Sequence, residues 1–407
     1  MKYDYPLLRA TSSSSTSGYV TVFLLASLCI QLSLFRIGDS RVNYPLTIMG
    51  YLVLFPYAVF NIAKMKSRVS TTLAASFSVY ASFCFASALW STDTSASISN
   101  ATLLFACLLI SIGGARYDPV QTRVIFVRIC LAVMVLSWVS LVVAPGYALQ
   151  EKGFWRLRGI MSHEFELGYL AGSSMLLSFA ELARALSRGT QERRLILTLV
   201  FLFSAATLLA TQTRTLLVYA ALCAALIMVS YTRGRIRIIS IFSLVVLTSI
   251  VAISVGYLED TFSRGESDAS LSGRTLIWAR TIAEAESRPL LGHGYSSFIS
   301  PIYDYIWTGN YRPPHAHNTW VMSYFEVGIV GAILVSIYLL SQLFVLRRTK
   351  QASGGLSPTF YVALFCTMTG MTSLIFGGKL SPMMAIILIL TFQEYNTTKR
   401  SLREDRG

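Results

Sequence analysis

A histidine at the start of a long apolar run is the first residue of this chain that could do chemistry. His317 follows the rigid pair Pro313-Pro314 within the segment HAHN. An imidazole titrates near neutral pH and can take a proton from a hydroxyl group, which makes His317 a candidate general base. Two alternatives stay open. His317 could be an interfacial residue of an aromatic belt, or it could form a metal pair with His315, although no HExxH motif or carboxylate cluster accompanies them.

Arginines gather in three segments that flank apolar runs. They are Arg156 and Arg158 in RLRGIMSH, which ends at His163, Arg214 in TQTR, and Arg274 and Arg288 in GRTLIWARTIAEAESRP. Guanidinium groups bind phosphate oxygens through paired donors and keep their charge. Together these arginines predict a clamp for a multiply charged anion such as a diphosphate. The alternatives are snorkelling at a helix end for Arg214 and contact with lipid phosphates from an amphipathic surface helix for the loop arginines.

The composition predicts that membrane helices position these residues. Of 407 residues, 54% are hydrophobic and 13% are charged, and the mean hydropathy is +0.57. Soluble proteins carry nearly twice this charged fraction, and apolar runs of this length match the hydrocarbon core of a bilayer. We expect an all-α polytopic membrane protein with about twelve transmembrane helices. The predicted spans are 19–35, 43–63, 70–90, 98–115, 122–144, 166–186, 195–210, 215–231, 236–257, 318–346, 357–376 and 381–395.

The charge distribution predicts the orientation of these spans. The net charge is +14, from 34 Lys and Arg against 20 Asp and Glu. If a polar tail (1–18) and a second tail (396–407) are both cytoplasmic, every cytoplasmic connection is basic, as the positive-inside rule requires. Helices one to nine then occupy 19–257, a large periplasmic loop occupies 258–317, and helices ten to twelve occupy 318–395. All four histidines and the clamp arginines fall on the outer face, so we expect no nucleic-acid binding.

Local patterns predict how the loop and the tenth span present their side chains. Ser272 is a candidate N-cap of a helix over 273–287, and the segment Gly292-His293-Gly294 predicts a tight turn. Helical spacing after Asn318 places His317, Gly328 and Gly331 near one face. The two glycines are then expected to let a neighbouring helix approach closely.

The order of these motifs resembles the bacterial O-antigen ligase and polysaccharide polymerase family. The matching elements are His317-Asn318 with the later GxxG (Gly328, Gly331), the block Gly273, Arg274, Trp278, Pro289, Gly292 and Gly294, the motif TQTR, and RLRGxxxH. The resemblance covers about residues 150–335. In one departure, the family often has His-x-Asn where this chain has His163-Glu164-Phe165, which leaves the role of His163 open.

The resemblance implies a GT-C-like glycosyltransferase of the bacterial inner membrane, with its active site facing the periplasm. Such enzymes transfer an oligosaccharide from undecaprenyl diphosphate to a sugar hydroxyl, on lipid A-core in ligases or on another repeat unit in polymerases. They use no metal, cofactor or nucleotide sugar, and other polysaccharide export or assembly proteins are expected partners. By position, His317 is the catalytic base, and Arg214 and Arg274 contact the diphosphate; His315, Asn318 and His163 support them. Attack by the deprotonated hydroxyl predicts inversion at the anomeric carbon.

Two other functional classes are alternatives. A polysaccharide transporter or lipid flippase predicts charges near mid-membrane and an internal repeat; the sequence shows no convincing repeat, and Arg128 is alone within a predicted span. A scaffold for envelope assembly predicts that His317→Ala leaves polymer synthesis intact. Within the enzyme class, ligase and polymerase both stay open. The aromatic stretch 303–311, which could stack on sugar rings, slightly favours a polymerase.

Overall fold

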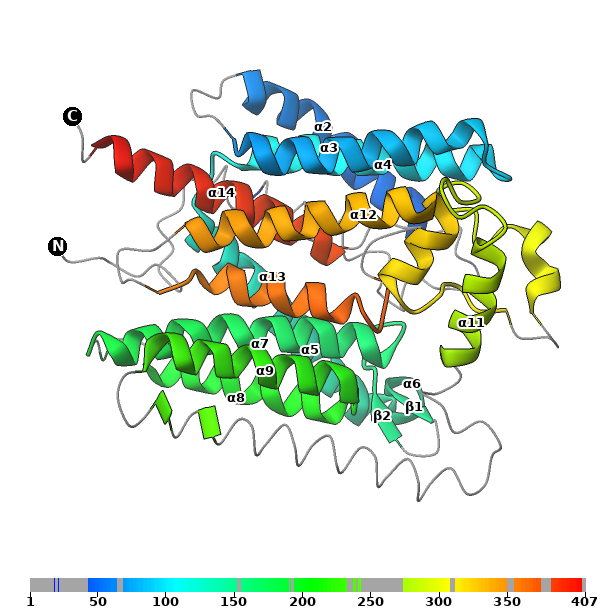
Figure 1. Cartoon of the computed structure of the whole chain (residues 1–407). Coiled ribbons are helices and arrows are strands. Elements are labelled where there is room, and N and C mark those ends of the chain that lie inside the picture. Colours follow the sequence, from blue (N-terminus) through cyan, green and yellow to red (C-terminus); the bar gives the residue numbers. More distant parts are fainter. Residues whose placement is uncertain are drawn as a thin grey trace.

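The structure is a computed structural model in which long helices lie side by side and a small sheet and short helices gather at one end (Figure 1). It describes residues 18, 21, 43–63, 69–151, 155–189, 191, 194–232, 237–238, 241–242, 274–307, 312–349, 355–374 and 382–404. The predicted first span apart from residue 21 and most of the predicted ninth lie outside the described residues, as do Ser272 and Gly273.

The long helices coincide with the predicted apolar runs. They are α2 (Asn43–Ala63), α3 (Thr71–Ala86) with the 3-10 turn η3 (Ser87–Leu89), α4 (Thr94–Gly114), α5 (Pro119–Val143), α7 (Glu164–Ser187), α8 (Arg194–Ala210), α9 (Arg214–Tyr231), α12 (Thr319–Arg348), α13 (Pro358–Thr369) and α14 (Pro382–Glu404). Side chains at the first turns fix several starting points. Asp93 and Asp118, for example, accept hydrogen bonds from backbone N–H groups at the starts of α4 and α5.

Five helices in the described part of the chain are long and apolar enough to cross a membrane: Thr71–Leu89, Thr94–Gly114, Pro119–Val143, Arg214–Tyr231 and Thr319–Arg348. Three shorter apolar helices are Leu52–Ala63, Arg194–Ala210 and Pro358–Thr369. The chain is thus mostly helical and suited to a membrane, as its composition predicts. The number of twelve spans stays a prediction.

The short elements lie at the end of the bundle where α12 begins (Figure 1). They are α6 (Pro145–Ala148), β1 (Leu149–Glu151), β2 (Trp155–Leu157), α11 (Arg274–Ala285) and η6 (Pro301–Ile306). The two strands pair antiparallel, with Leu149 opposite Leu157. This small sheet departs from the all-α expectation. It forms because the segment before α7 folds back on itself at the end of the bundle.

Two helices differ from the predicted limits by more than four residues at one end. α13 ends at Thr369, seven residues before the predicted limit of 376, because the chain turns at Gly370. α14 continues to Glu404, into the region that the apolar pattern assigns to a tail, because polar side chains continue a helix once it leaves hydrocarbon.

Candidate active site

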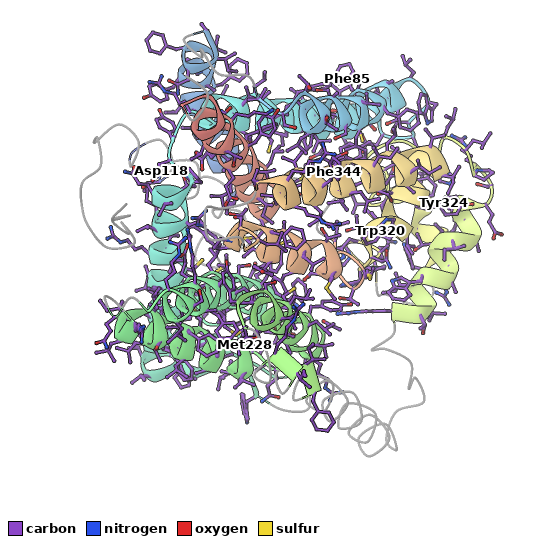
Figure 2. All side chains as sticks on the ribbon, turned by 60° about the vertical axis from the view of Figure 1, so that its left-hand side comes forward. Phe85, Asp118, Met228, Trp320, Tyr324 and Phe344 are labelled. Carbon is purple, nitrogen blue, oxygen red and sulfur yellow. The ribbon has the colours of Figure 1, made fainter. Side chains whose placement is uncertain are left out.

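Helix α12 is broken at Gly328, which has φ 67° and ψ −171°. This conformation is essentially restricted to glycine. Trp320, before the break, donates a hydrogen bond from Nε1 to Ser336 Oγ, after it, at 2.9 Å. In a straight helix these two residues would be about 24 Å apart, so the segment 319–327 is turned sharply against 329–348 (Figures 1 and 2). The expectation of one continuous span over 318–346 is therefore wrong at Gly328.

The loop 289–294 closes this break through backbone contacts. The His293 N–H donates to Phe325 O at 3.0 Å, the Gly294 N–H to Glu326 O at 2.7 Å, and the Ile329 N–H to Pro289 O at 2.9 Å. A Cβ on Gly328 would overlap the Leu290 carbonyl group, and one on Gly292 would lie 2.6 Å from Glu326 O. The glycines of both motifs thus allow loop and helix backbones to touch. The neighbour that approaches Gly328 is this loop, and the expectation of a neighbouring helix there is wrong.

The loop has a small hydrophobic core of its own. Ala285, Phe298, Tyr303, Ala316, Met322 and Phe325 form a buried cluster separate from the main core of the bundle. His293 belongs beside this cluster, because its ring packs against Tyr303 and Phe325, and its Nε2 lies 3.2 Å from Glu284 O. Only 3% of His293 is exposed. Burial lowers the pKa of His293, while the Glu284 carbonyl and carboxylate raise it. This histidine therefore holds the loop together.

His315 and His317 lie together at the start of α12. Their ring centroids are 4.1 Å apart, and the His317 backbone N–H donates to His315 Nδ1 at 3.2 Å. Because Nδ1 of His315 accepts this hydrogen bond, its neutral ring carries the proton on Nε2. His317 has φ 53°, a left-handed conformation that is uncommon outside glycine and concentrates at functional sites. Both rings are half-buried.

Asn318 fixes the chain directly after this pair. Its Oδ1 accepts hydrogen bonds from the Trp320 N–H at 2.8 Å and the Val321 N–H at 3.1 Å, as an N-cap does. Its Nδ2 donates to Met371 O at 2.9 Å, in the turn that follows α13. Asn318 therefore caps α12 and ties its start to that turn, while its supporting role at the site stays a prediction.

Helix α11 is tied to the histidine pair through Trp278. The Trp278 Nε1–H donates to Ala316 O, between His315 and His317, at 2.8 Å. Arg274 is four residues earlier, so it lies on the same face of α11 as Trp278. This hydrogen bond links the helix that begins at Arg274 to the segment that carries His317.

Arg156 and His163 come together around Glu164, and Arg274 is within electrostatic reach of them. Arg156 Nη1 lies 3.3 Å from Glu164 Oε1, and His163 Nδ1 lies 3.0 Å from Glu164 Oε2. Burial lowers the pKa of the Arg274 guanidinium, Tyr219 and Glu164 act against this shift, and Arg156 adds to it. The two ion pairs to Glu164 join β2 to the start of α7, and the charges of Arg156 and Glu164 reach Arg274 at the start of α11. We call Arg156, His163, Glu164 and Arg274 the arginine cluster.

The TQTR turn lies beside the arginine cluster. Gln212 has φ 51°, and its Nε2 donates to Trp155 O at 3.1 Å, one residue before Arg156. The hydroxyl oxygens of Thr211 and Thr213 are 2.9 Å apart, and both face Gly168 of α7, where a Cβ would crowd them. Arg214 follows as the first residue of α9. The turn therefore places Arg214 at the same end of the bundle as the cluster.

Two predicted clamp residues are engaged elsewhere. Arg158 donates from Nε to Tyr147 O at 2.8 Å and stacks its guanidinium over the Tyr147 ring. Arg288 lies beyond the far end of α11 and donates to Trp90 O at 3.5 Å. The structure brings neither of them to the arginine cluster.

Sequence reasoning did not assign a role to Glu164, which appeared there only as a departure from a family pattern. Its side chain is 2% exposed and contacts Arg156 and His163. A signal was present, because an acidic residue in the first turn of a helix, eight positions after an arginine, can fold back onto it. Among the described residues, no group of three or more His, Cys, Asp or Glu side chains could hold a metal ion.

Comparison with known proteins bears on this region directly. Residues 199–336 match a family model described as O-Antigen ligase, and this stretch includes Arg214, Arg274, His317, Gly328 and Gly331. The chain is also 23% identical over 254 residues to the exopolysaccharide production protein ExoQ of Rhizobium meliloti (strain 1021). The alignment covers 60% of this chain and 51% of ExoQ, so the chain spans about half the length of this relative. The two matches support the O-antigen ligase and polysaccharide polymerase family for this chain, as its motifs indicate.

Proposed function

We propose that this chain is a membrane glycosyltransferase of polysaccharide or O-antigen assembly. It transfers an oligosaccharide from undecaprenyl diphosphate to a sugar hydroxyl at the periplasmic face of the bacterial inner membrane. The acceptor is either a growing surface or exopolysaccharide glycan or lipid A-core. The observation that carries this proposal is the hydrogen bond from Trp278 to Ala316, because it links the helix of Arg274 to the segment of His317.

In the proposed reaction, His317 takes the proton of the acceptor hydroxyl as that oxygen bonds to the anomeric carbon of the donor. The bond from this carbon to the diphosphate oxygen breaks, and its electron pair stays on the leaving diphosphate. Attack from the side opposite the leaving group inverts the anomeric carbon. The protein supplies a base and cationic groups, and we propose that no metal takes part. General base catalysis of this kind contributes about 10²–10⁴-fold in rate.

The arginines stabilise the charge that builds on the leaving diphosphate. Arg274 and Arg156 act on each other electrostatically at the arginine cluster, and Arg214 begins α9 after the TQTR turn beside it. Two guanidinium groups repel each other unless an anion lies between or beside them. Glu164 partly compensates this repulsion in the free protein, which keeps the site assembled before the diphosphate binds. Removal of one such cation typically lowers the rate by about 10²–10³-fold.

His315 is proposed to position His317. The hydrogen bond from the His317 backbone to His315 Nδ1 holds the two-residue turn, and the edge-to-face contact of the two rings fixes the direction of the base. The break at Gly328 and the cap at Asn318 hold the segment that carries both histidines. In this proposal Arg158 and Arg288 help at the edges of the site, where long donor glycans or lipid phosphates pass.

The decisive experiment uses purified protein with a polyprenyl-diphosphate oligosaccharide, with and without lipid A-core. Product on lipid A-core identifies a ligase, and a ladder of products without it identifies a polymerase. We expect His317→Ala and Arg274→Ala each to lower the rate at least about 100-fold. Arg347→Ala, an exposed arginine at the opposite end of α12, is the matched control and should keep full activity.

Full activity of His317→Ala would overturn the proposed base and favour a scaffold. A requirement for a divalent metal ion would overturn the metal-free mechanism. Retention of the anomeric configuration, measured by NMR on the product, would show that the reaction is not a single displacement. Transport of the donor across vesicles without any new glycosidic bond would favour the transporter or flippase.

A further inference from the structure

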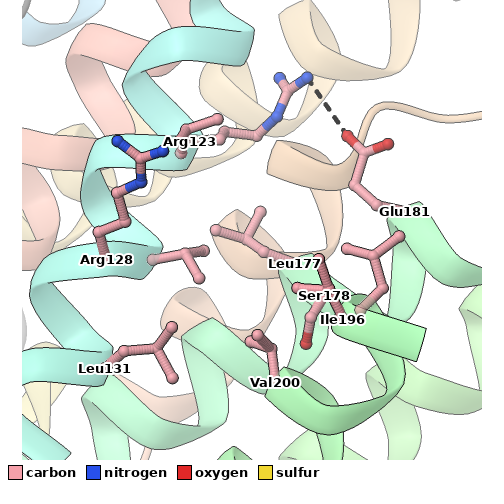
Figure 3. A pocket seen from close by; sticks show the side chains of 11 residues that line it. Arg123, Arg128, Leu131, Leu177, Ser178, Glu181, Ile196 and Val200 are labelled. Carbon is pink, nitrogen blue, oxygen red and sulfur yellow. Dashed lines mark ion pairs between the residues drawn. The ribbon is translucent and has the colours of Figure 1, made fainter. Parts of the chain in front are cut away.

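Figure 3 shows a cavity between α5, α7 and α8. Its lining residues lie toward the ends of these helices that are opposite the candidate active site. Its wall is apolar over most of its area, with Val127 and Leu131 from α5, Leu177 from α7, and Ile196 and Val200 from α8. Ile196 is 42% exposed, so the cavity opens on the outer surface of the bundle. For a helix bundle in a bilayer, that surface faces lipid tails.

Arg123 and Arg128 line the cavity from neighbouring turns of α5, but only one of them is available to a ligand. Arg123 is buried, and its guanidinium lies 2.6 Å from Glu394 Oε1 and 3.5 Å from Glu181 Oε1. Arg128 is exposed and makes no hydrogen bond or ion pair with any residue that the structure describes. The cavity therefore combines an apolar wall with one uncompensated positive charge at its edge.

The position of Arg128 along α5 makes this charge unusual. Pro119–Val143 is long and apolar enough to cross a membrane, and Arg128 lies nine residues after its start, at a rise of about 14 Å. An arginine at that depth is costly unless it reaches the interface or meets an anion. Figure 3 shows its guanidinium directed toward the end of α5 where Arg123 lies, and Leu131 on the other side. If α5 enters the bilayer at its start, that direction leads to the headgroup level of the nearer leaflet.

We infer that this cavity binds one anionic diacyl phospholipid of the surrounding membrane. The lipid phosphate pairs with Arg128, and one acyl chain lies along Leu131, Leu177 and Val200. The predicted topology makes this the cytoplasmic leaflet, where anionic lipids are attracted by basic residues near the surface. The site is separate from the proposed diphosphate site, which lies at the other ends of α7 and α9. The inference therefore goes beyond the glycosyltransferase proposal and does not depend on it.

Lipid binding to the full-length, delipidated protein in detergent tests the inference by native mass spectrometry. The probes are dioleoyl phosphatidylglycerol and dioleoyl phosphatidylcholine, which share their acyl chains and differ in net charge. We expect wild type to bind the anionic lipid about fivefold more tightly, the preference typical of one cation near a membrane phosphate. Arg128→Gln should bind both lipids equally, and Arg347→Gln, an exposed arginine outside the cavity, should keep the wild-type preference.

A second variant tests the contribution of the apolar wall separately from that of the Arg128 charge. Val200→Phe fills the apolar wall and should weaken both lipids while the protein without lipid melts at the wild-type temperature. The inference is overturned if Arg128→Gln keeps the fivefold preference, or if Val200→Phe binds both lipids as wild type does. It is also overturned if a second copy of the chain covers the cavity and lipid binding is absent.

Discussion

Replacing Gly328 with alanine is expected to undock the loop 289–294 from α12. Gly328 has φ 67° and ψ −171°, a region that costs non-glycine residues about 1–3 kcal/mol. The added Cβ would also overlap the Leu290 carbonyl group, which is backbone and cannot rotate away. The alanine variant must therefore either keep the strain or move the loop.

The hydrogen bonds across the break set the size of the effect. Three backbone bonds of 2.7–3.0 Å join the loop to the helix segment, and each contributes about 1 kcal/mol net. Moving the loop therefore costs about 3 kcal/mol, which lowers the docked population by about two orders of magnitude. The segment that carries His317 loses its support on one side. We expect activity to fall by up to about 100-fold, although the membrane helices stay folded.

Hydrogen exchange measured by mass spectrometry checks this prediction together with activity. The amides of His293, Gly294 and Ile329 should exchange about 100-fold faster in Gly328→Ala. Gly146→Ala is the matched control, because a Cβ at Gly146 meets no atom within 4 Å at the same end of the molecule. Wild-type exchange and activity in Gly328→Ala would show that the loop is not held by the break, and the argument would fail.

Three further predictions concern other contacts. Trp278→Phe removes the hydrogen bond to Ala316 and should lower kcat about fivefold with KM little changed, since about 1 kcal/mol of positioning is lost; an altered KM alone would contradict it. Burial lowers the pKa of His293, so below pH ~6.5 this histidine binds a proton more readily in the unfolded chain than in the folded one. The free energy of unfolding should therefore be highest above that pH and fall by at most about 1.4 kcal/mol per pH unit below it. Thermal unfolding between about pH 5 and 8 checks this, and His293→Gln should flatten the acid side. Arg123→Met leaves the buried Glu394 carboxylate unpaired and should cost about 3–5 kcal/mol in a detergent unfolding assay, whereas wild-type stability would mean that the pair is dispensable.

The positions of most long helices follow from the sequence because span length is fixed by the bilayer. The predicted run 43–63 coincides with α2, and 195–210 differs from α8 by one residue at its start. Local sequence patterns also predict a helix in the loop. The predicted helix over 273–287 is observed as α11, with its described start at Arg274.

The break in α12 could not be predicted from periodicity. A glycine in an apolar run has the same pattern whether it packs against a helix or leaves the helical conformation. The conformation of Gly328 is fixed by its contact with the Leu290 backbone, which is 38 residues earlier in the chain. A local sequence pattern cannot reveal such a tertiary contact. Glu164 was missed for a related reason. The cost of burying a carboxylate depends on its partners, and Arg156 becomes a partner only when β2 turns back toward α7.

The spacing of the motifs has a geometric explanation in this fold. Trp278 bonds to Ala316 at one point, and Pro289 bonds to Ile329 at another, so α11 and the segment 319–327 run between the same two contacts. The nine residues of that segment span about 14 Å as a helix. The HN and GxxG elements are therefore separated by the distance that α11 and its loop cover from Trp278 to the break at Gly328. The two motif blocks therefore form one structural unit. Its two contacts, at Trp278 and at Pro289, hold the segment that follows His317 in register with the loop.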